Sequence, residues 1–80
     1  MKVIGIQKNV SFNYDGTNFQ GLNLYTSEEK NGVEGFVTNK FFINKDKPIY
    51  KDAIEVKLGD EISFNYNRFG KPETLFIENE

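Results

Sequence analysis

Residues 2–27 read KVIGIQKNVSFNYDGTNFQGLNLYTS and contain the strongest structural signal in the chain. Two segments of alternating apolar and polar residues, 2–12 and 19–27, flank the dipeptide Asp15-Gly16. Alternation with a period of two is typical of β-strands, and Asp-Gly is a strong signal for a tight hairpin turn. The stretch therefore predicts an antiparallel β-hairpin.

The remainder of the chain continues as short segments separated by turn residues. Three further strands are expected, over residues 33–43, 61–67 and 73–77. Between the third and the fourth lies a link, residues 44–57, which the sequence assigns either to irregular structure or to one or two turns of helix. The chain is thus expected to be all-β, with three strands, a link and two more strands.

This order is typical of a small five-stranded antiparallel OB-like barrel, formed here as a single domain over residues 1–80. An SH3-like barrel or an open five-stranded sheet would give a similar pattern. Period-two alternation also predicts which side chains face inward. The expected core consists of Ile4, Ile6, Leu22, Leu24, Val37, Ile62, Phe64, Leu75 and Ile77.

Composition argues against catalysis. The chain has no cysteine and no histidine, which removes disulfides, thiolate metal sites and the usual general base. Its serines, Ser11, Ser27 and Ser63, therefore have no histidine to activate them. We expect a binding protein without enzymatic activity, cofactor or metal. Apolar runs are too short to cross a membrane and no secretory segment is evident, so a cytoplasmic location is expected.

Aromatic residues make up 15% of the chain, and some lie in phase with basic side chains. Binders of single-stranded nucleic acid combine aromatic faces that stack on bases with a cationic groove. Rings on the strand faces opposite the aliphatic residues, and a cationic hairpin tip, would supply both. The predicted nucleic-acid site comprises Tyr25, Phe36, Lys40 and Phe42 on the strands and Arg68, Phe69 and Lys71 at the tip.

The same rings have two other interpretations. They would also fill a core that is poor in leucine and valine, or cover the seam of a dimer. The net charge of −2 also argues against a strongly basic nucleic-acid module. The alternative function is therefore a protein-interaction or structural module, which would expose an apolar patch without a positive stripe.

Two stretches, 58–62 (LGDEI) and 66–73 (YNRFGKPE), resemble small proteins of phages and conjugative elements of Gram-positive bacteria, as do Glu34-Gly35 and residues 2–5. Those proteins are similar in size and layout to the single-stranded DNA-binding proteins of filamentous phages. The resemblance implies an OB-like dimer that coats single-stranded DNA during replication or transfer of a phage or mobile element. From the residues alone, the expected partner is single-stranded DNA or RNA. A homodimer is also expected because a small domain without disulfides or metals gains stability by association.

Overall fold

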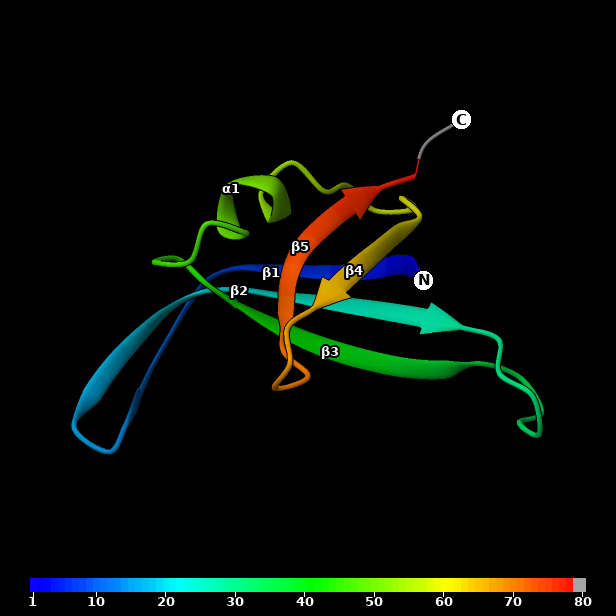
Figure 1. Ribbon diagram of the computed structural model, residues 1–80, viewed down its shortest axis with the longest axis horizontal. Helices are drawn as coiled ribbons and strands as arrows, with labels where there is room; N and C mark the ends of the chain where they lie inside the picture. Colours follow the sequence, from blue (N-terminus) through cyan, green and yellow to red (C-terminus); the bar gives the residue numbers. More distant parts are fainter. Residues whose placement is uncertain (79–80) are drawn as a thin grey trace.

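The computed structural model describes residues 1–78, which form five β-strands and one short helix (Figure 1). The elements are β1 (Lys2–Tyr14), β2 (Thr17–Glu28), β3 (Val37–Asn44), α1 (Tyr50–Ala53), β4 (Ile62–Tyr66) and β5 (Pro72–Ile77). Strands β1, β2 and β3 form an antiparallel meander, and β4 and β5 form a separate two-stranded sheet. The prediction of a mostly β chain with a short link between the third and fourth strands is therefore confirmed.

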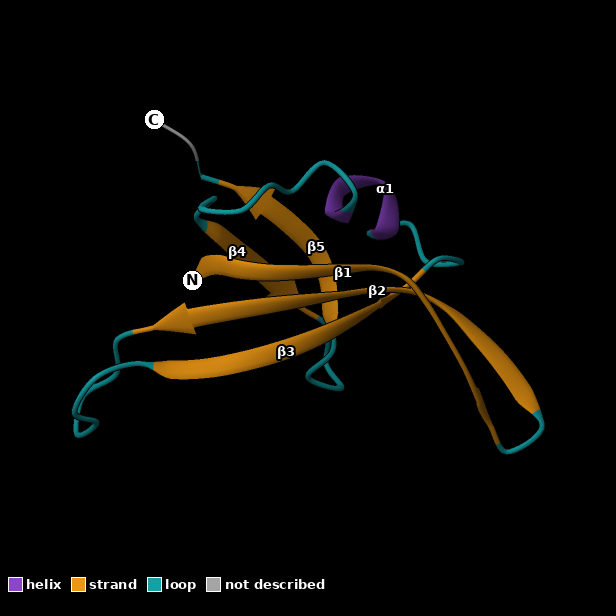
Figure 2. Cartoon of the chain, turned by 180° about the vertical axis from the view of Figure 1, so that it is seen from behind, coloured by secondary structure: helices purple, strands orange, loops and turns teal. Residues whose placement is uncertain are grey.

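The first hairpin forms where the sequence predicts it. Tyr14 pairs with Thr17, and the two residues between them have positive φ angles, 49° at Asp15 and 76° at Gly16. This two-residue turn has the backbone twist that suits antiparallel strands. Beyond the body of the protein, residues 9–20 continue as a two-stranded arm (Figures 1 and 2).

Two bulges in β1 decide which of its side chains face the core. The first lies between Val3 and Gly5 and adds Ile4 to the strand. One extra residue reverses the phase of the side chains, so Val3 is only 1% exposed whereas Ile4 is 51% exposed. The prediction that Ile4 belongs to the core is therefore wrong.

The third strand is shorter than predicted. It begins at Val37 and not at Val33, because Gly32 and Gly35 both adopt positive φ angles that do not occur in a regular strand. From Val37 onward the pairing with β2 is regular, and it ends at the pair of Asn44 with Gly21.

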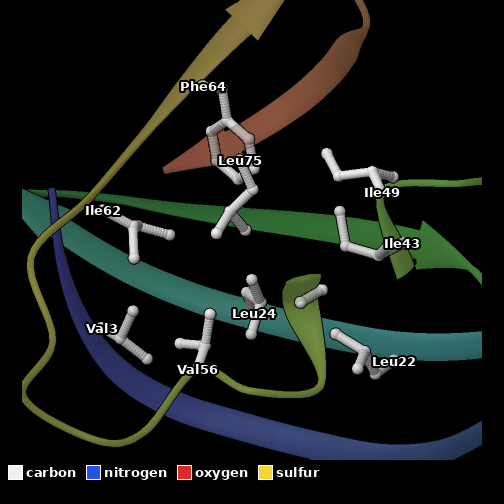
Figure 3. Packing of buried hydrophobic residues seen from close by; sticks show 10 residues of the cluster. Val3, Leu22, Leu24, Ile43, Ile49, Val56, Ile62, Phe64 and Leu75 are labelled. Atoms are coloured by element: carbon white, nitrogen blue, oxygen red, sulfur yellow. The ribbon is translucent and has the colours of Figure 1, made fainter. Parts of the chain in front are cut away.

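The core lies between the meander and the β4–β5 hairpin (Figure 3). Three groups of buried residues form it: Val3, Leu22, Leu24 and Ile43 from the meander, Ile62, Phe64 and Leu75 from the hairpin, and Ile49, Ala53 and Val56 from the link. Of the other predicted core residues, Ile6 and Ile77 are half-buried and pack against this cluster, and Val37 is half-buried. The sequence interpretation predicted the link but placed none of its residues in the core, although three of them close one side of it.

The two sheets meet at the start of β1. The Val3 amide donates to the carbonyl oxygen of Asp60 at 2.9 Å, and Ile62 donates to that of Met1 at 2.8 Å, on either side of a bridge between Lys2 and Glu61. On the opposite side, β3 meets the hairpin through side chains, with the Phe41 and Phe64 ring centroids 4.8 Å apart. Among residues 1–78 no backbone pairing joins β3 to β5, so the described strands do not close into a barrel. None of the helical segments described is long and apolar enough to span a membrane.

Candidate functional site

The meander has an outer face, which we define as the side turned away from β4, β5 and α1. Register pairing assigns side chains to this face, because residues directly opposite each other in a sheet share a side. Its members are Lys2, Gly5, Gln7, Val10, Phe12, Tyr14, Thr17, Phe19, Gly21, Asn23, Tyr25, Ser27, Thr38, Lys40, Phe42 and Asn44. None of these residues of the three described strands is acidic, although the chain as a whole carries a net charge of −2. Glu61 borders the face at one end, opposite Lys2.

Three residues of the predicted site lie close together on the outer face. Tyr25 of β2 is directly opposite Lys40 of β3, and Phe42 follows Lys40 on the same side of β3. Tyr25 and Phe42 are half-buried and Lys40 is exposed. The register thus places two aromatic rings and one cation on adjacent positions of two strands.

Each of the two rings packs over a glycine of the neighbouring strand. A Cβ atom on Gly5 would lie 3.3 Å from Cδ2 of Tyr25, and one on Gly21 would lie 3.0 Å from Cζ of Phe42. Because glycine has no side chain, the rings can lie close to the sheet backbone at these two positions. The glycines therefore help to make this part of the face flat and aromatic.

Two further rings that the sequence interpretation missed extend this surface toward the arm. Phe12 stacks on Phe19 with ring centroids 5.4 Å apart, and it meets Phe42 edge-on at 5.1 Å. Phe19 is in phase with Tyr25 along β2, so the alternation in the sequence could have assigned the two rings to the same face. Phe12 could not be assigned in the same way, because the second bulge of β1, between Gln7 and Val10, reverses the phase once more.

A small amide network lies between Tyr25 and Phe42. Asn23 Nδ2 donates to Gln7 Oε1 at 3.2 Å, and the Tyr25 hydroxyl donates to the same oxygen at 3.2 Å. Asn23 is 5% exposed, and its Oδ1 atom has no hydrogen-bond partner among the described residues. A buried polar atom without a partner is uncommon in folded proteins.

The remaining predicted residues lie on other elements. Phe36 is 66% exposed in the loop immediately before β3, at a position that extends the alternation of Lys40 and Phe42. Arg68, Phe69 and Lys71 form the tip of the β4–β5 hairpin, which packs on the inner face of the meander, and the tip extends past β3 (Figure 1).

The hairpin tip is held in a defined conformation. Asn67 Oδ1 accepts hydrogen bonds from the backbone amides of Phe69 at 2.9 Å and Lys71 at 3.1 Å, and Gly70 has a φ of 76°. Cζ of the Arg68 guanidinium lies 5.0 Å from the centre of the Phe69 ring, within cation–π range. Since Phe69 is 73% exposed, the tip presents an aromatic ring and two cations to solvent.

Together these features define a small, mostly β protein with an aromatic sheet face on which the described strands place no acidic side chain. No protein-family model matches the chain, and searches among curated proteins and among solved structures also found no match.

Proposed function

We propose that this protein binds single-stranded DNA, or RNA, across the outer face of the meander. In this proposal it coats and protects the strand during replication or transfer of a phage or mobile element. The observation that carries the binding proposal is the concentration of aromatic and neutral polar side chains on a face without carboxylates, in a chain that is acidic overall. Phosphates are repelled by carboxylates, so such a face is the region of the protein that a polyanion would meet most favourably.

Stacking on the rings would supply most of the affinity. Each base stacked on an aromatic side chain contributes about 1–3 kcal/mol, with little dependence on sequence. Tyr25, Phe42 and the Phe12–Phe19 pair form a row of such surfaces along the face. The half-buried rings are held by their neighbours, so little conformational entropy is lost when a base stacks on them.

The cations around these rings are few. Lys40 lies beside Tyr25 and Lys2 lies at one end of the face, while Arg68 and Lys71 are at the hairpin tip. For single strands the logarithm of the affinity falls with that of the salt concentration by about 0.7 per phosphate contact. A small number of contacts therefore predicts modest affinity and a shallow salt dependence.

The arrangement of the strands supports an OB-like interpretation of the fold. With the bridge between Lys2 and Glu61, the strands follow the order β3–β2–β1–β4–β5, with the link between β3 and β4. Partly open five-stranded barrels of this class bind oligonucleotides on strands 2 and 3 and with the loops that join strands 1 to 2 and 4 to 5. In this chain, strands 2 and 3 are β2 and β3, which carry Tyr25 and Lys40. The loop that joins strands 1 and 2 corresponds to the arm, and the loop that joins strands 4 and 5 corresponds to the hairpin tip with Arg68.

A fluorescence-anisotropy titration with labelled oligo-dT at two salt concentrations tests the proposal. We expect binding that weakens as salt increases. Phe42→Ala should weaken it by about 1–3 kcal/mol without changing the salt slope, because it removes a stacking surface. Lys40→Gln should weaken it and reduce the slope by about 0.7, because it removes one phosphate contact.

Phe76→Ala provides the control, since Phe76 is a 46% exposed phenylalanine on β5, outside the outer face. It should leave both the affinity and the salt slope unchanged. Absence of oligo-dT binding by the wild-type protein at low salt would exclude the proposal and favour a protein-interaction module. An equal loss in the Phe76 and Phe42 variants would show that the face is not the binding site.

We also propose that the protein is a homodimer in which the arm contacts a second copy. Two-stranded hairpins are only marginally stable when nothing covers them. The arm lies outside the body and exposes Tyr14 (71%) near its tip. A contact confined to the tip leaves Tyr25, Lys40 and Phe42 on the body available to nucleic acid.

Light scattering should give the mass of a dimer for the wild-type protein and that of a monomer for Tyr14→Asp, because a buried, unpaired carboxylate at the seam is strongly unfavourable. Asp15→Asn, at the tip of the same arm, is the control and should remain dimeric. A monomer mass for the wild-type protein up to millimolar concentration would contradict the dimer.

A further inference from the structure

A small open pocket lies at the base of the arm, where β1 and β2 leave the body (Figure 2). Its volume is about 140 Å³, whereas one water molecule needs only about 10–15 Å³. Three segments line it, namely Asn9, Val10 and Ser11 of β1, Gln20 and Gly21 of β2, and Lys45 and Tyr50 of the link. The pocket therefore has room for a ligand of several non-hydrogen atoms.

The pocket and the stacking rings lie on opposite sides of the arm. Ser11 pairs with Gln20, and this pair alternates with the Phe12–Phe19 pair along the two strands. Successive residues of a strand point to opposite faces, so a ligand in the pocket would not meet these rings. The pocket is thus a separate feature from the outer face.

The polar groups in the pocket have unused capacity to donate hydrogen bonds. Within residues 1–78, Lys45 forms no ion pair, and the Asn9 amide and the Tyr50 hydroxyl take part in none of the side-chain hydrogen bonds. Ser11 Oγ accepts from Asn18 Nδ2 at 3.2 Å, which leaves its own proton free to donate. None of the lining residues is acidic. Hydroxyl and amide groups can bind many polar ligands, but a pocket with an ammonium group and no carboxylate favours a negatively charged one.

The local charge also favours an anion at this place. The segments around the pocket, residues 8–11, 20–21 and 44–52, contain four lysines and two aspartates, although the whole chain has a net charge of −2. Neither of the two aspartates lines the pocket. A locally positive potential of this kind raises the concentration of anions near a site.

The backbone holds the lining residues in place. Asn9 has a φ of 57°, a left-handed conformation that is uncommon outside glycine, at the second bulge of β1. The Lys45 amide donates to the Gln20 carbonyl oxygen at 2.7 Å and so joins the link to the arm, while Tyr50 packs against the core. Ligand binding would therefore require little ordering of the chain.

We propose that this pocket binds a phosphate group. Its donors come from three segments that surround the ligand, an arrangement that suits tetrahedral oxygens better than a planar carboxylate. A phosphate monoester also carries a charge of about −1.5 to −2 at neutral pH, more than a carboxylate does. The phosphate can be free or part of a small molecule, or it can belong to the backbone of a nucleic acid. The proposal does not rest on the proposed function.

An NMR titration of the isotope-labelled protein with sodium phosphate at constant pH tests the site. We expect saturable shifts of the backbone amides of Asn9, Ser11 and Lys45, with a dissociation constant of about 1–10 mM, because a single cation in an open pocket is screened by water. Sodium chloride and sodium acetate at the same ionic strength should produce no saturable shifts there. Shifts that increase linearly with phosphate, or equal shifts with acetate, would overturn the proposal.

Variants of the lining provide the second measurement. Lys45→Gln should weaken phosphate binding about three- to tenfold, because it removes the charge of the pocket. Asn9→Gly should weaken it about two- to fivefold and keep the fold, since glycine readily adopts the positive φ of this position. Lys47→Gln is the matched control, because it removes the same charge outside the lining and should change the affinity by less than about twofold. Equal losses in the Lys45 and Lys47 variants would overturn the site.

Oligo-dT titrations of the same variants distinguish the two sources of the phosphate. If the pocket holds a phosphate of a bound strand, Lys45→Gln weakens oligo-dT binding and lowers its salt slope by about 0.7, whereas Lys47→Gln does not. If the pocket holds a free phosphate or that of a small molecule, both variants bind oligo-dT as the wild-type protein does. Saturable phosphate binding by a protein that does not bind oligo-dT would overturn the proposed function and support the pocket.

Discussion

Leu24→Ala should lower the free energy of unfolding by about 2–5 kcal/mol, the range observed when a buried leucine is truncated. Leu24 is 0% exposed and lies on β2, the central strand of the meander, where it pairs with Ile6 on β1 and Phe41 on β3. The core cannot collapse fully around the missing atoms because it is lined by three strands, a hairpin and the link. A domain of this size is stabilised by only about 0.05–0.15 kcal/mol per residue, so this substitution removes a large part of the total.

Urea denaturation followed by circular dichroism measures the effect, since the chain contains no tryptophan for fluorescence. Ile4→Ala is the control. It deletes as many carbon atoms as Leu24→Ala does, but Ile4 is the bulged residue of β1 and is 51% exposed. Its cost should therefore be below about 1 kcal/mol. Equal losses in the two variants would show that the bulge, and with it the phase of β1, is placed incorrectly.

Gly21→Ala is expected to have the second large effect, because it acts on the fold and on the site at once. A methyl group at Gly21 would overlap the carbonyl oxygen of Ile43 on β3, and it would also press on the Phe42 ring. Backbone atoms cannot move aside independently, so β2 and β3 must separate at this end of their pairing. The hydrogen bond from the Lys45 amide to the Gln20 carbonyl oxygen, 2.7 Å long, lies next to this point and would be strained as well.

We expect Gly21→Ala to destabilise the protein by about 1–3 kcal/mol or more, as for other substitutions that overpack a structure. The aromatic proton resonances of Phe42 and Phe12 should shift in NMR spectra, since the two rings are in edge-on contact. Gly5→Ala is a matched control on the same face, where the new methyl group would meet only the Tyr25 side chain at 3.3 Å. A Gly21 variant as stable as the wild-type protein would mean that β2 and β3 do not approach as closely as described.

Local signals in the sequence determined much of the architecture. Asp15-Gly16 fixed the first hairpin, because its two residues tolerate the positive φ angles that a two-residue turn requires. Alternation along β2 identified Leu22 and Leu24 as inward and Tyr25 as outward, since this central strand contains no bulge. The order of three strands, a short link and two strands could likewise be predicted from periodicity and turn residues, although these signals assigned the link to either irregular or helical structure.

The candidate site was only partly predictable. Tyr25, Lys40 and Phe42 could be grouped by phase, because β2 and β3 pair in regular register. Phe12 could not, because its orientation depends on a bulge that no local residue pattern announces. The buried state of Asn23 was also hidden, since it arises from the neighbours that cover it on adjacent strands.

The set of strands, the turns and the inward face of β2 follow from interactions between residues that are close in the chain, so they could be predicted. Contacts between distant segments, in contrast, place Val3 in the core in place of Ile4 and close the core with Ile49, Ala53 and Val56 of the link. Bulges and core closure depend on which segments meet across the fold, and the free energy of those contacts overrides local periodicity. The same long-range pairing of β1, β2 and β3 assembles the outer face, on which these strands place no acidic side chain.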